Sequence, residues 1–193
     1  MQPVDVLVVG GGPAGIASAL FLSHVAPELT DRMLVVEKEH YPREKFCAGA
    51  VGERAYRLLS SIGVQLCTPS VPVSSIAFRA MGETLEVRGD AIGRVVRRIE
   101  FDDELATVAR SRGIRVLDGV RVTGVTLGTH GSSVATSAGE FRPRVLIGAD
   151  GVGSIVRRAF GYASAQYNAQ ALEVDTELVP ADLPRDVLLF DVS

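Results

Sequence analysis

The sequence predicts an α/β fold built on a Rossmann-type parallel sheet, and three observations near the N-terminus carry this prediction. Residues 5–9 (DVLVV) form an apolar run that is typical of a buried parallel strand. Gly10, Gly12 and Gly15 follow at once with the G-x-G-x-x-G spacing. Residues 16–25 (IASALFLSHV) then combine helix-forming residues with apolar positions at helical spacing. The order is therefore strand, glycine turn and helix.

Each glycine of this turn has a mechanical role in our interpretation. Gly10 makes the tight turn, Gly12 lets the backbone approach a pyrophosphate, and Gly15 lets the helix pack closely against the strand. The N–H groups at the start of the helix face the ligand, and the aligned peptide dipoles leave roughly +0.5 charge there. The turn therefore predicts a phosphate site that needs no basic side chain.

A second predicted strand, residues 33–36, leads directly into Glu37. This acid stands roughly 20 residues after the glycine turn, the spacing expected of a carboxylate that binds a ribose hydroxyl. A carboxylate here disfavours a ribose 2′-phosphate, because two anions would face each other. A plain strand-to-helix turn does not explain three glycines together with Glu37. We therefore expect an adenosine with a free 2′-hydroxyl, as in NAD or FAD.

Composition excludes several classes of protein. The 193 residues suit one domain or slightly more, and 20 Lys plus Arg against 23 Asp plus Glu leave no basic block for nucleic acid. Cys47 and Cys67 give no disulfide framework, and His24, His40 and His130 match no metal-ligand spacing. No run approaches the 18 or more apolar residues of a membrane span. We expect a cytoplasmic protein without a metal, whose membrane contact, if any, is peripheral.

The rest of the chain extends this sheet and interrupts it. Residues 38–50 are predicted to form a loop that crosses near the cofactor. The hairpin predicted for residues 75–79 and 84–88 does not continue a parallel sheet. Residues 67–92 are therefore expected to form an excursion into a second layer. The other predicted elements are helices over 52–62 and 101–112, a hairpin of 75–79 with 84–88, strands over 114–117 and 145–148, a meander of 120–127, 133–137 and 140–141, and sheet strands over 171–179 and 187–192.

Four segments in fixed order resemble the FAD-binding half of the flavoprotein monooxygenase superfamily, whose members include aromatic hydroxylases, flavin-dependent halogenases and geranylgeranyl reductases. These segments are DVLVVGGGPAGIASALFL, VEKEHYPREKFCAGA, RRIEFDDELATVA and VLIGADGVGSIVRR. The resemblance implies an FAD-binding Rossmann-type (GR2-like) parallel sheet with a β-meander, plus the beginning of a β-rich substrate domain. The FAD-binding domain would comprise residues 1–66 and 93–162, and residues 67–92 and 163–193 would be part of a substrate-binding sheet.

The same resemblance implies where FAD would bind. The glycines of the turn would seat the pyrophosphate, Glu37 would bind the adenosine ribose, and Arg43 and Arg98 would reach the phosphate and ribityl region. The strand around Val122 would offer its backbone to the adenine, and Asp150 would bind the ribityl chain or pyrophosphate. Both arginines could instead be solvated surface charges, and Asp150 could be a helix N-cap. The implied cofactor-binding set is Gly10, Gly12, Pro13, Ala14, Gly15, Glu37, Lys38, Arg43, Cys47, Ala48, Arg98, Val122, Asp150 and Gly151.

Within the superfamily, residues 42–49 (PREKFCAG) look most like the P-R-E-K-x-C-G-G segment of geranylgeranyl reductases, which saturate isoprenoid double bonds. Halogenases usually carry a G-E-S type sequence there. Ala48 stands where a glycine is common. By this resemblance Cys47 would lie near the isoalloxazine, as a catalytic thiol donor or as packing that tunes the flavin. The alternative is a small buried hydrophobe.

We therefore expect an FAD-dependent oxidoreductase whose flavin is reduced by NAD(P)H or another donor, and which reduces an isoprenoid or other organic substrate. One alternative is a hydroxylase or halogenase that activates oxygen and acts on an aromatic substrate. Another is a non-catalytic FAD-binding module that needs a partner chain. A plain NAD-binding domain is disfavoured by the Asp150 segment and by the excursion over residues 41–92.

Superfamily members of this kind carry a later Gly-Asp motif, a completed substrate sheet and a C-terminal helical region. The sequence up to Ser193 contains none of these. The chain is therefore expected to be a truncated piece or one part of a two-chain enzyme. In either case the strand over 187–192 would leave an unpaired edge that favours association.

Overall fold

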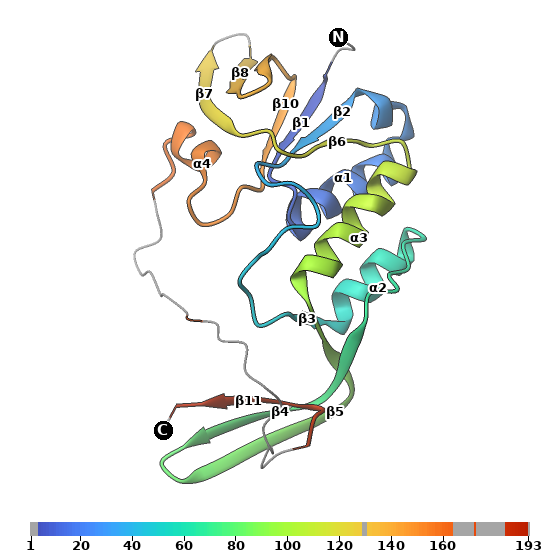
Figure 1. Ribbon diagram of the computed structural model, residues 1–193, viewed down its shortest axis with the longest axis vertical. Coiled ribbons are helices and arrows are strands. Elements are labelled where there is room, and N and C mark those ends of the chain that lie inside the picture. Colours follow the sequence, from blue (N-terminus) through green and yellow to red (C-terminus); the bar gives the residue numbers. More distant parts are fainter. Residues whose placement is uncertain (1–3, 129–130, 164–171, 173–183, 193) are drawn as a thin grey trace. The chain divides into compact units, whose positions relative to one another are not determined.

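The computed structural model describes residues 4–128, 131–163, 172 and 184–192 of the chain. It contains two compact units, which are described separately below (Figure 1). The first unit comprises residues 1–43 and 102–169, and the second comprises residues 44–101 and 170–193. The second unit takes in residues 44–66, which the resemblance places in the FAD-binding domain. The division into an FAD-binding and a substrate-binding domain stays a prediction.

The first unit is built on a parallel sheet, as the sequence predicts. Its strand order is β10-β1-β2-β6, with each neighbouring pair parallel. Val6 lies opposite Met33 on one side and Val145 on the other. The two central strands are buried at every position, which explains their unbroken apolar sequences. The strands are β1 (Val6–Val9), β2 (Met33–Val36), β6 (Arg115–Leu117) and β10 (Val145–Gly148).

Helices precede or follow the strands of this sheet along the chain. Helix α1 (Pro13–Val25) begins directly after Gly12, with Pro13 at the first position, where a missing N–H costs nothing. A 3₁₀ helix, η1 (Pro27–Arg32), leads into β2 and was not predicted. Helix α3 (Arg98–Ser111) begins three residues before its predicted start, and α4 (Ile155–Ala159) is a short helix after β10.

The predicted meander packs against one face of the parallel sheet. Strands β7 (Val122–Gly128), β8 (Gly131–Thr136) and β9 (Gly139–Phe141) pair antiparallel in sequence order. Val134 and Phe141 join Leu7, Val9, Leu34, Val36 and Val156 in one buried cluster. This cluster fixes the meander, β1, β2 and α4 as one layered core.

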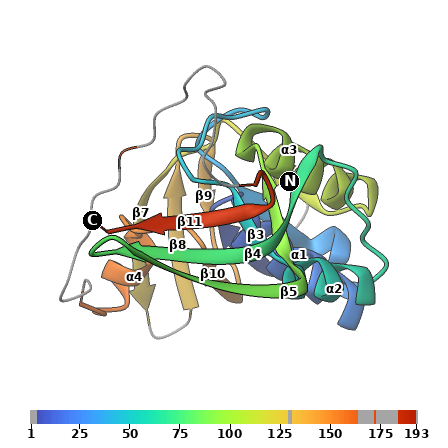
Figure 2. The same ribbon diagram turned by 90° about the horizontal axis from the view of Figure 1, so that it is seen from below.

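The second unit contains a sheet of order β11-β4-β5-β3 and the amphipathic helix α2 (Glu53–Ser61) (Figure 2). Strands β4 (Ser70–Ala80) and β5 (Glu83–Val96) form the predicted hairpin, but each is longer than expected. Met81 and Gly82 turn the hairpin with φ of 52° and 81°, the positive pair that a two-residue turn uses. Strand β11 (Val187–Asp191) pairs parallel to β4, and β3 (Ala50–Gly52) pairs antiparallel to β5. The strand predicted over 171–179 lies outside the described residues, apart from Leu172.

One face of the three-stranded part of this sheet is apolar. Phe78 stands opposite Leu85 on β5 and Phe190 on β11, and the two phenylalanine rings stack at 5.1 Å between centroids. The next apolar row is Ile76, Val87 and Leu188. Leu85 is 67% exposed and Val87 is 57% exposed. The sheet thus presents uncovered hydrocarbon side chains among the described residues.

Candidate functional site: a glycine turn with buried charges

Two glycines of the turn are required by the fold itself. Gly10 has φ of +105°, and a Cβ on it would overlap the carbonyl oxygen of Ala149. A Cβ on Gly15 would overlap the carbonyl oxygen of Gly10, so α1 can approach β1 only because Gly15 has no side chain. Gly10 also donates its N–H to the carbonyl oxygen of Val36 at 2.9 Å, which ties the turn to β2.

Gly12 is different, because none of the described residues excludes a side chain there. Its φ of −73° and ψ of 178° are an extended conformation that any residue adopts. Among the described residues, a Cβ on Gly12 would meet only Nη2 of Arg43, at 3.4 Å. The space beside Gly12 is therefore open toward a guanidinium at the N-terminus of a 13-residue helix. An anionic pyrophosphate fits this combination of free backbone approach and positive charge.

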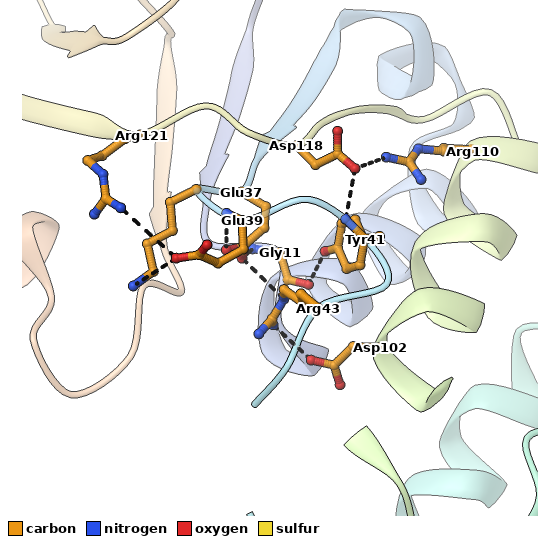
Figure 3. Close-up of polar contacts among 10 residues, drawn as sticks. Gly11, Glu37, Glu39, Tyr41, Arg43, Asp102, Arg110, Asp118 and Arg121 are labelled. Atoms are coloured by element: carbon orange, nitrogen blue, oxygen red, sulfur yellow. Dashed lines mark hydrogen bonds and ion pairs between the residues drawn. The ribbon is translucent and has the colours of Figure 1, made fainter. Parts of the chain in front are cut away.

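Glu37 lies at the end of β2 with its side chain already oriented toward the turn. It is 6% exposed, and its Oε2 accepts a hydrogen bond from Gly11 N–H at 2.8 Å (Figure 3). Its Oε1 accepts from Glu39 N–H at 3.1 Å. A carboxylate has about four acceptor sites, so capacity remains for a ribose hydroxyl. The geometry fits the predicted ribose ligand.

Arg43 is buried, so it is not a solvated surface charge. Its side chain is 8% exposed, and its Nη2 lies 2.8 Å from Oδ2 of Asp102, which is fully buried. Its Nε lies 3.8 Å from Oε2 of Glu37 and has no hydrogen-bond partner among the described residues. A buried guanidinium with donor capacity beside Gly12 is what a phosphate would use. Arg43 was predicted from the sequence as a site residue, whereas Asp102 was not.

Tyr41 contacts the glycine turn at Gly11. Its hydroxyl donates a hydrogen bond to the carbonyl oxygen of Gly11, and its backbone N–H donates to Oδ2 of Asp118 at 3.1 Å. Burial, followed by the negative charge of Glu37, raises the pKa of Tyr41 to about 12. Burial also acts to raise the pKa of Asp118, but hydrogen bonds from Tyr41 and Arg110 outweigh it and lower that pKa. Neither Tyr41 nor Asp118 was predicted as a site residue.

Four more predicted residues, Pro13, Ala14, Lys38 and Val122, belong to the first unit. Pro13 and Ala14 form the first turn of α1, and Lys38 is exposed, with its Nζ 3.7 Å from Oε1 of Glu39. Val122 is the first residue of β7. Two residues before it, the N–H of Val120 donates a hydrogen bond to the carbonyl oxygen of Glu37 at 2.8 Å. Their contacts with a cofactor stay predictions.

Asp150 lies two residues after the end of β10, and its carboxylate binds the start of α4. Oδ2 accepts from the N–H groups of Ile155 and Val156 at 2.7 and 3.3 Å, and Oδ1 accepts from the Ser154 hydroxyl at 2.5 Å. Ser154 is the N-cap, because its hydroxyl oxygen accepts from Arg157 N–H at 2.9 Å. Asp150 therefore makes the helix-capping contacts that were its alternative role. A role of Asp150 and the neighbouring Gly151 toward FAD stays a prediction.

Three predicted residues belong to the second unit. Cys47 and Ala48 are exposed, and Arg98 is half-buried at the start of α3. The exposure of Cys47 does not agree with a small buried hydrophobe. The described residues contain no group of three or more His, Cys, Asp or Glu that could hold a metal ion. No helix in the described ranges is long and apolar enough to cross a membrane.

A parallel βαβ unit whose open glycine turn is flanked by a buried acid and a buried arginine defines a dinucleotide-binding α/β protein. Comparison with known families specifies the class further. Residues 3–187 match the family described as FAD binding domain, and the chain belongs to this family. The prediction of an FAD-binding flavoprotein fold is thereby confirmed.

Several relatives share this part of the chain. An uncharacterized protein of Methanosarcina barkeri is 30% identical over 197 residues, which cover 99% of this chain and 48% of the relative. A menaquinone reductase of Mycobacterium tuberculosis is 30% identical over 81% of this chain and 40% of its own length. A digeranylgeranylglycerophospholipid reductase of Methanosarcina mazei is 29% identical over 93% of this chain and 42% of its own length. The chain thus spans less than half the length of these relatives.

Solved structures show the same fold. A geranylgeranyl bacteriochlorophyll reductase-like protein of Thermoplasma acidophilum superimposes with a TM-score of 0.70 over 100% of this chain and 51% of its own, at 20% identity. The flavin-dependent halogenase CmlS gives a TM-score of 0.70 over 83% of this chain and 32% of its own, at 24% identity. Reductases and halogenases therefore share this scaffold, and the fold alone does not choose between them.

Proposed function

We propose that this chain binds FAD at the glycine turn and supplies the cofactor-binding part of a reductase that saturates a double bond of an isoprenoid substrate. The observation that carries the cofactor assignment is Gly12. This residue needs no special backbone angle and would accept a side chain, yet its open side faces the buried Arg43. A pyrophosphate that occupies this space explains the glycine.

Different residues of the chain would bind different parts of the cofactor. The turn and the start of α1 would bind the pyrophosphate, with Arg43 beside it, and Glu37 would bind the adenosine ribose. The chemistry that FAD supplies when bound is two-electron transfer, in which a hydride from a donor such as NAD(P)H reaches a carbon–carbon double bond together with a proton. Cys47 is the residue that we propose for contact with the reacting end.

Two observations support a reductase with an apolar substrate. The relatives include proteins named as a menaquinone reductase and a digeranylgeranylglycerophospholipid reductase. The second unit presents an apolar sheet face, in which Phe78, Leu85 and Phe190 stand in one row. Such a face suits the hydrocarbon chain of an isoprenoid better than a polar substrate.

The length of the relatives indicates that turnover needs more polypeptide than cofactor binding does. The chain matches only 40–48% of the three relatives described above. We propose that turnover needs polypeptide equivalent to the rest of those proteins, in the same chain or in a partner. The chain by itself would then hold FAD without completing the reaction.

The first test is a titration of the purified chain with FAD, followed by visible absorption and flavin fluorescence. Heat-released cofactor is identified by mass. We expect bound FAD in the wild-type chain and none in Gly12→Val, in which a branched side chain would occupy the phosphate space. A folded wild-type chain that takes up no FAD contradicts the cofactor assignment.

The second test separates the reaction classes. The chain, together with any partner that co-purifies with it, is supplied with FAD, NAD(P)H and a geranylgeranyl substrate under nitrogen. A reductase saturates the double bond without oxygen, whereas a hydroxylase or halogenase forms product only in air. Product that appears only in air would contradict the reductase proposal in favour of a monooxygenase.

A further inference from the structure

Both polar groups of Gly11, in the middle of the glycine turn, are held by side chains. Tyr41 donates its hydroxyl hydrogen to the carbonyl oxygen of Gly11, and Gly11 N–H donates to Oε2 of Glu37 at 2.8 Å (Figure 3). Both side chains come from the segment after β2. A Cβ on Gly11 would overlap the Tyr41 hydroxyl and approach Cβ of Glu37 to 2.8 Å. Gly11 and Tyr41 therefore fit each other only as a pair.

Tyr41 is itself anchored by two other elements. Its backbone N–H donates to Oδ2 of Asp118 at 3.1 Å, and the same oxygen accepts from Nη2 of Arg110 at 3.1 Å. The guanidinium carbons of Arg43 and Arg110 lie 5.8 and 5.4 Å from the centre of the Tyr41 ring, within cation–π range. The position of the hydroxyl is thus set by α3 and by the turn after β6.

The bond between Tyr41 and Gly11 has a consequence for Gly12. The peptide that joins Gly11 to Gly12 is trans, so its carbonyl oxygen and its N–H point in opposite directions. With the carbonyl oxygen bound to Tyr41, the N–H of Gly12 points away from Tyr41. Backbone N–H groups at the start of a helix are the ones that bind a dinucleotide phosphate.

We propose that Tyr41 is a positioning residue for the cofactor pyrophosphate. It sets the orientation of the Gly11–Gly12 peptide and thereby presents the Gly12 N–H to a phosphate oxygen. Tyr41 acts through Gly11 and does not touch the cofactor. This role rests on the proposed FAD site at the glycine turn and adds to it a residue outside the G-x-G-x-x-G pattern.

The test compares Tyr41→Phe, which removes only the hydroxyl, with Tyr162→Phe as a matched control at an exposed position. Affinities for FAD, ADP and adenosine are measured by fluorescence titration and by ligand-observed NMR. We expect Tyr41→Phe to bind FAD and ADP roughly 3- to 10-fold more weakly, the loss of one net hydrogen bond. Adenosine, which has no phosphate, should bind both variants as it binds the wild type.

The outcomes separate the two proposals. Wild-type chain that binds neither FAD nor ADP overturns the FAD site together with this role. Wild-type binding that is unchanged in Tyr41→Phe overturns the role of Tyr41 alone. An equal loss for ADP and adenosine also overturns it, because a general structural defect would weaken both. Should Tyr41→Phe not fold, Asp118→Asn serves instead, because it loosens the backbone anchor of Tyr41 without altering the glycine turn. We expect the same selective loss of affinity for FAD and ADP.

Discussion

Arg43 and Asp102 form a buried ion pair in the first unit. Nη2 of Arg43 lies 2.8 Å from Oδ2 of Asp102, and their side chains are 8% and 0% exposed. Asp102 lies in α3, whereas Nη2 of Arg43 lies beside Gly12 of the glycine turn. The pair therefore joins α3 to the residue that lies beside Gly12, and its loss should affect stability.

Asp102→Ala should destabilise the fold. Removal of one partner of a buried ion pair leaves the other charge uncompensated, which typically costs 3–5 kcal/mol. Glu37 lies near Nε of Arg43 and offsets part of this cost, so we expect a loss of about 3 kcal/mol in the free energy of unfolding. Urea denaturation measures it. Asp103→Ala, the neighbouring acid on the same helix, is the control and should change stability by about 0.5 kcal/mol or less. Equal losses in the two variants would show that the pair has no special role.

Gly12→Ala and Gly15→Ala should separate binding from folding. A Cβ at Gly12 makes an ordinary contact at 3.4 Å with Arg43, whereas a Cβ at Gly15 overlaps the Gly10 carbonyl oxygen. We expect Gly12→Ala to melt within a few degrees of the wild type and to bind FAD at least about tenfold more weakly, since its methyl group enters the phosphate space. Gly15→Ala should lower the melting temperature strongly. Undiminished FAD affinity in Gly12→Ala would contradict the assignment of the phosphate site to this turn.

The fold was predictable where its signals are local in sequence. The strand, glycine turn and helix of residues 5–25 lie within one continuous segment, and the meander has turns of a few residues. The hairpin was predicted too short, because the alternation of apolar and polar residues in β5 stops at Arg88 and residues 89–94 (GDAIGR) break it. Strand β3 has only three residues and carries no pattern of its own.

The site was predictable only where a spacing carries it. Gly10, Gly12, Gly15 and Glu37 follow a known separation along the chain. Tyr41 contacts Gly11 across 30 residues, Arg43 contacts Asp102 across 59, and Tyr41 contacts Asp118 across 77. No local pattern distinguishes Asp102 from Asp103, since both are acids in the first turns of a helix, where acids are common. Such partners appear only once the chain is folded.

The alkaline limit of stability should depend on Tyr41. Its pKa rises from 10.0 to about 12 on folding, so the folded state holds the hydroxyl proton more tightly than the unfolded chain does. The stabilisation is complete below about pH 10 and is lost as the pH rises toward 12. Because the side chain is partly exposed, solvent screening reduces the effect to about 1–2 kcal/mol. Denaturation between pH 9 and 12 should show a steeper fall for the wild type than for Tyr41→Phe. Parallel pH profiles would contradict this linkage.

Cys47→Ser should separate a role in turnover from a role in cofactor binding. Cys47 is exposed and belongs to the second unit, whereas the glycine turn, Glu37 and Arg43 belong to the first. The substitution keeps a small polar side chain but removes the thiol, which is the more acidic and more nucleophilic group. We expect FAD affinity to be unchanged and the turnover of the assembled enzyme to change. Cys67→Ser, at another exposed cysteine of the same unit, is the control and should leave both quantities unaltered. Turnover that is the same in Cys47→Ser, Cys67→Ser and the wild type would remove Cys47 from the chemistry and leave the cofactor site as it stands.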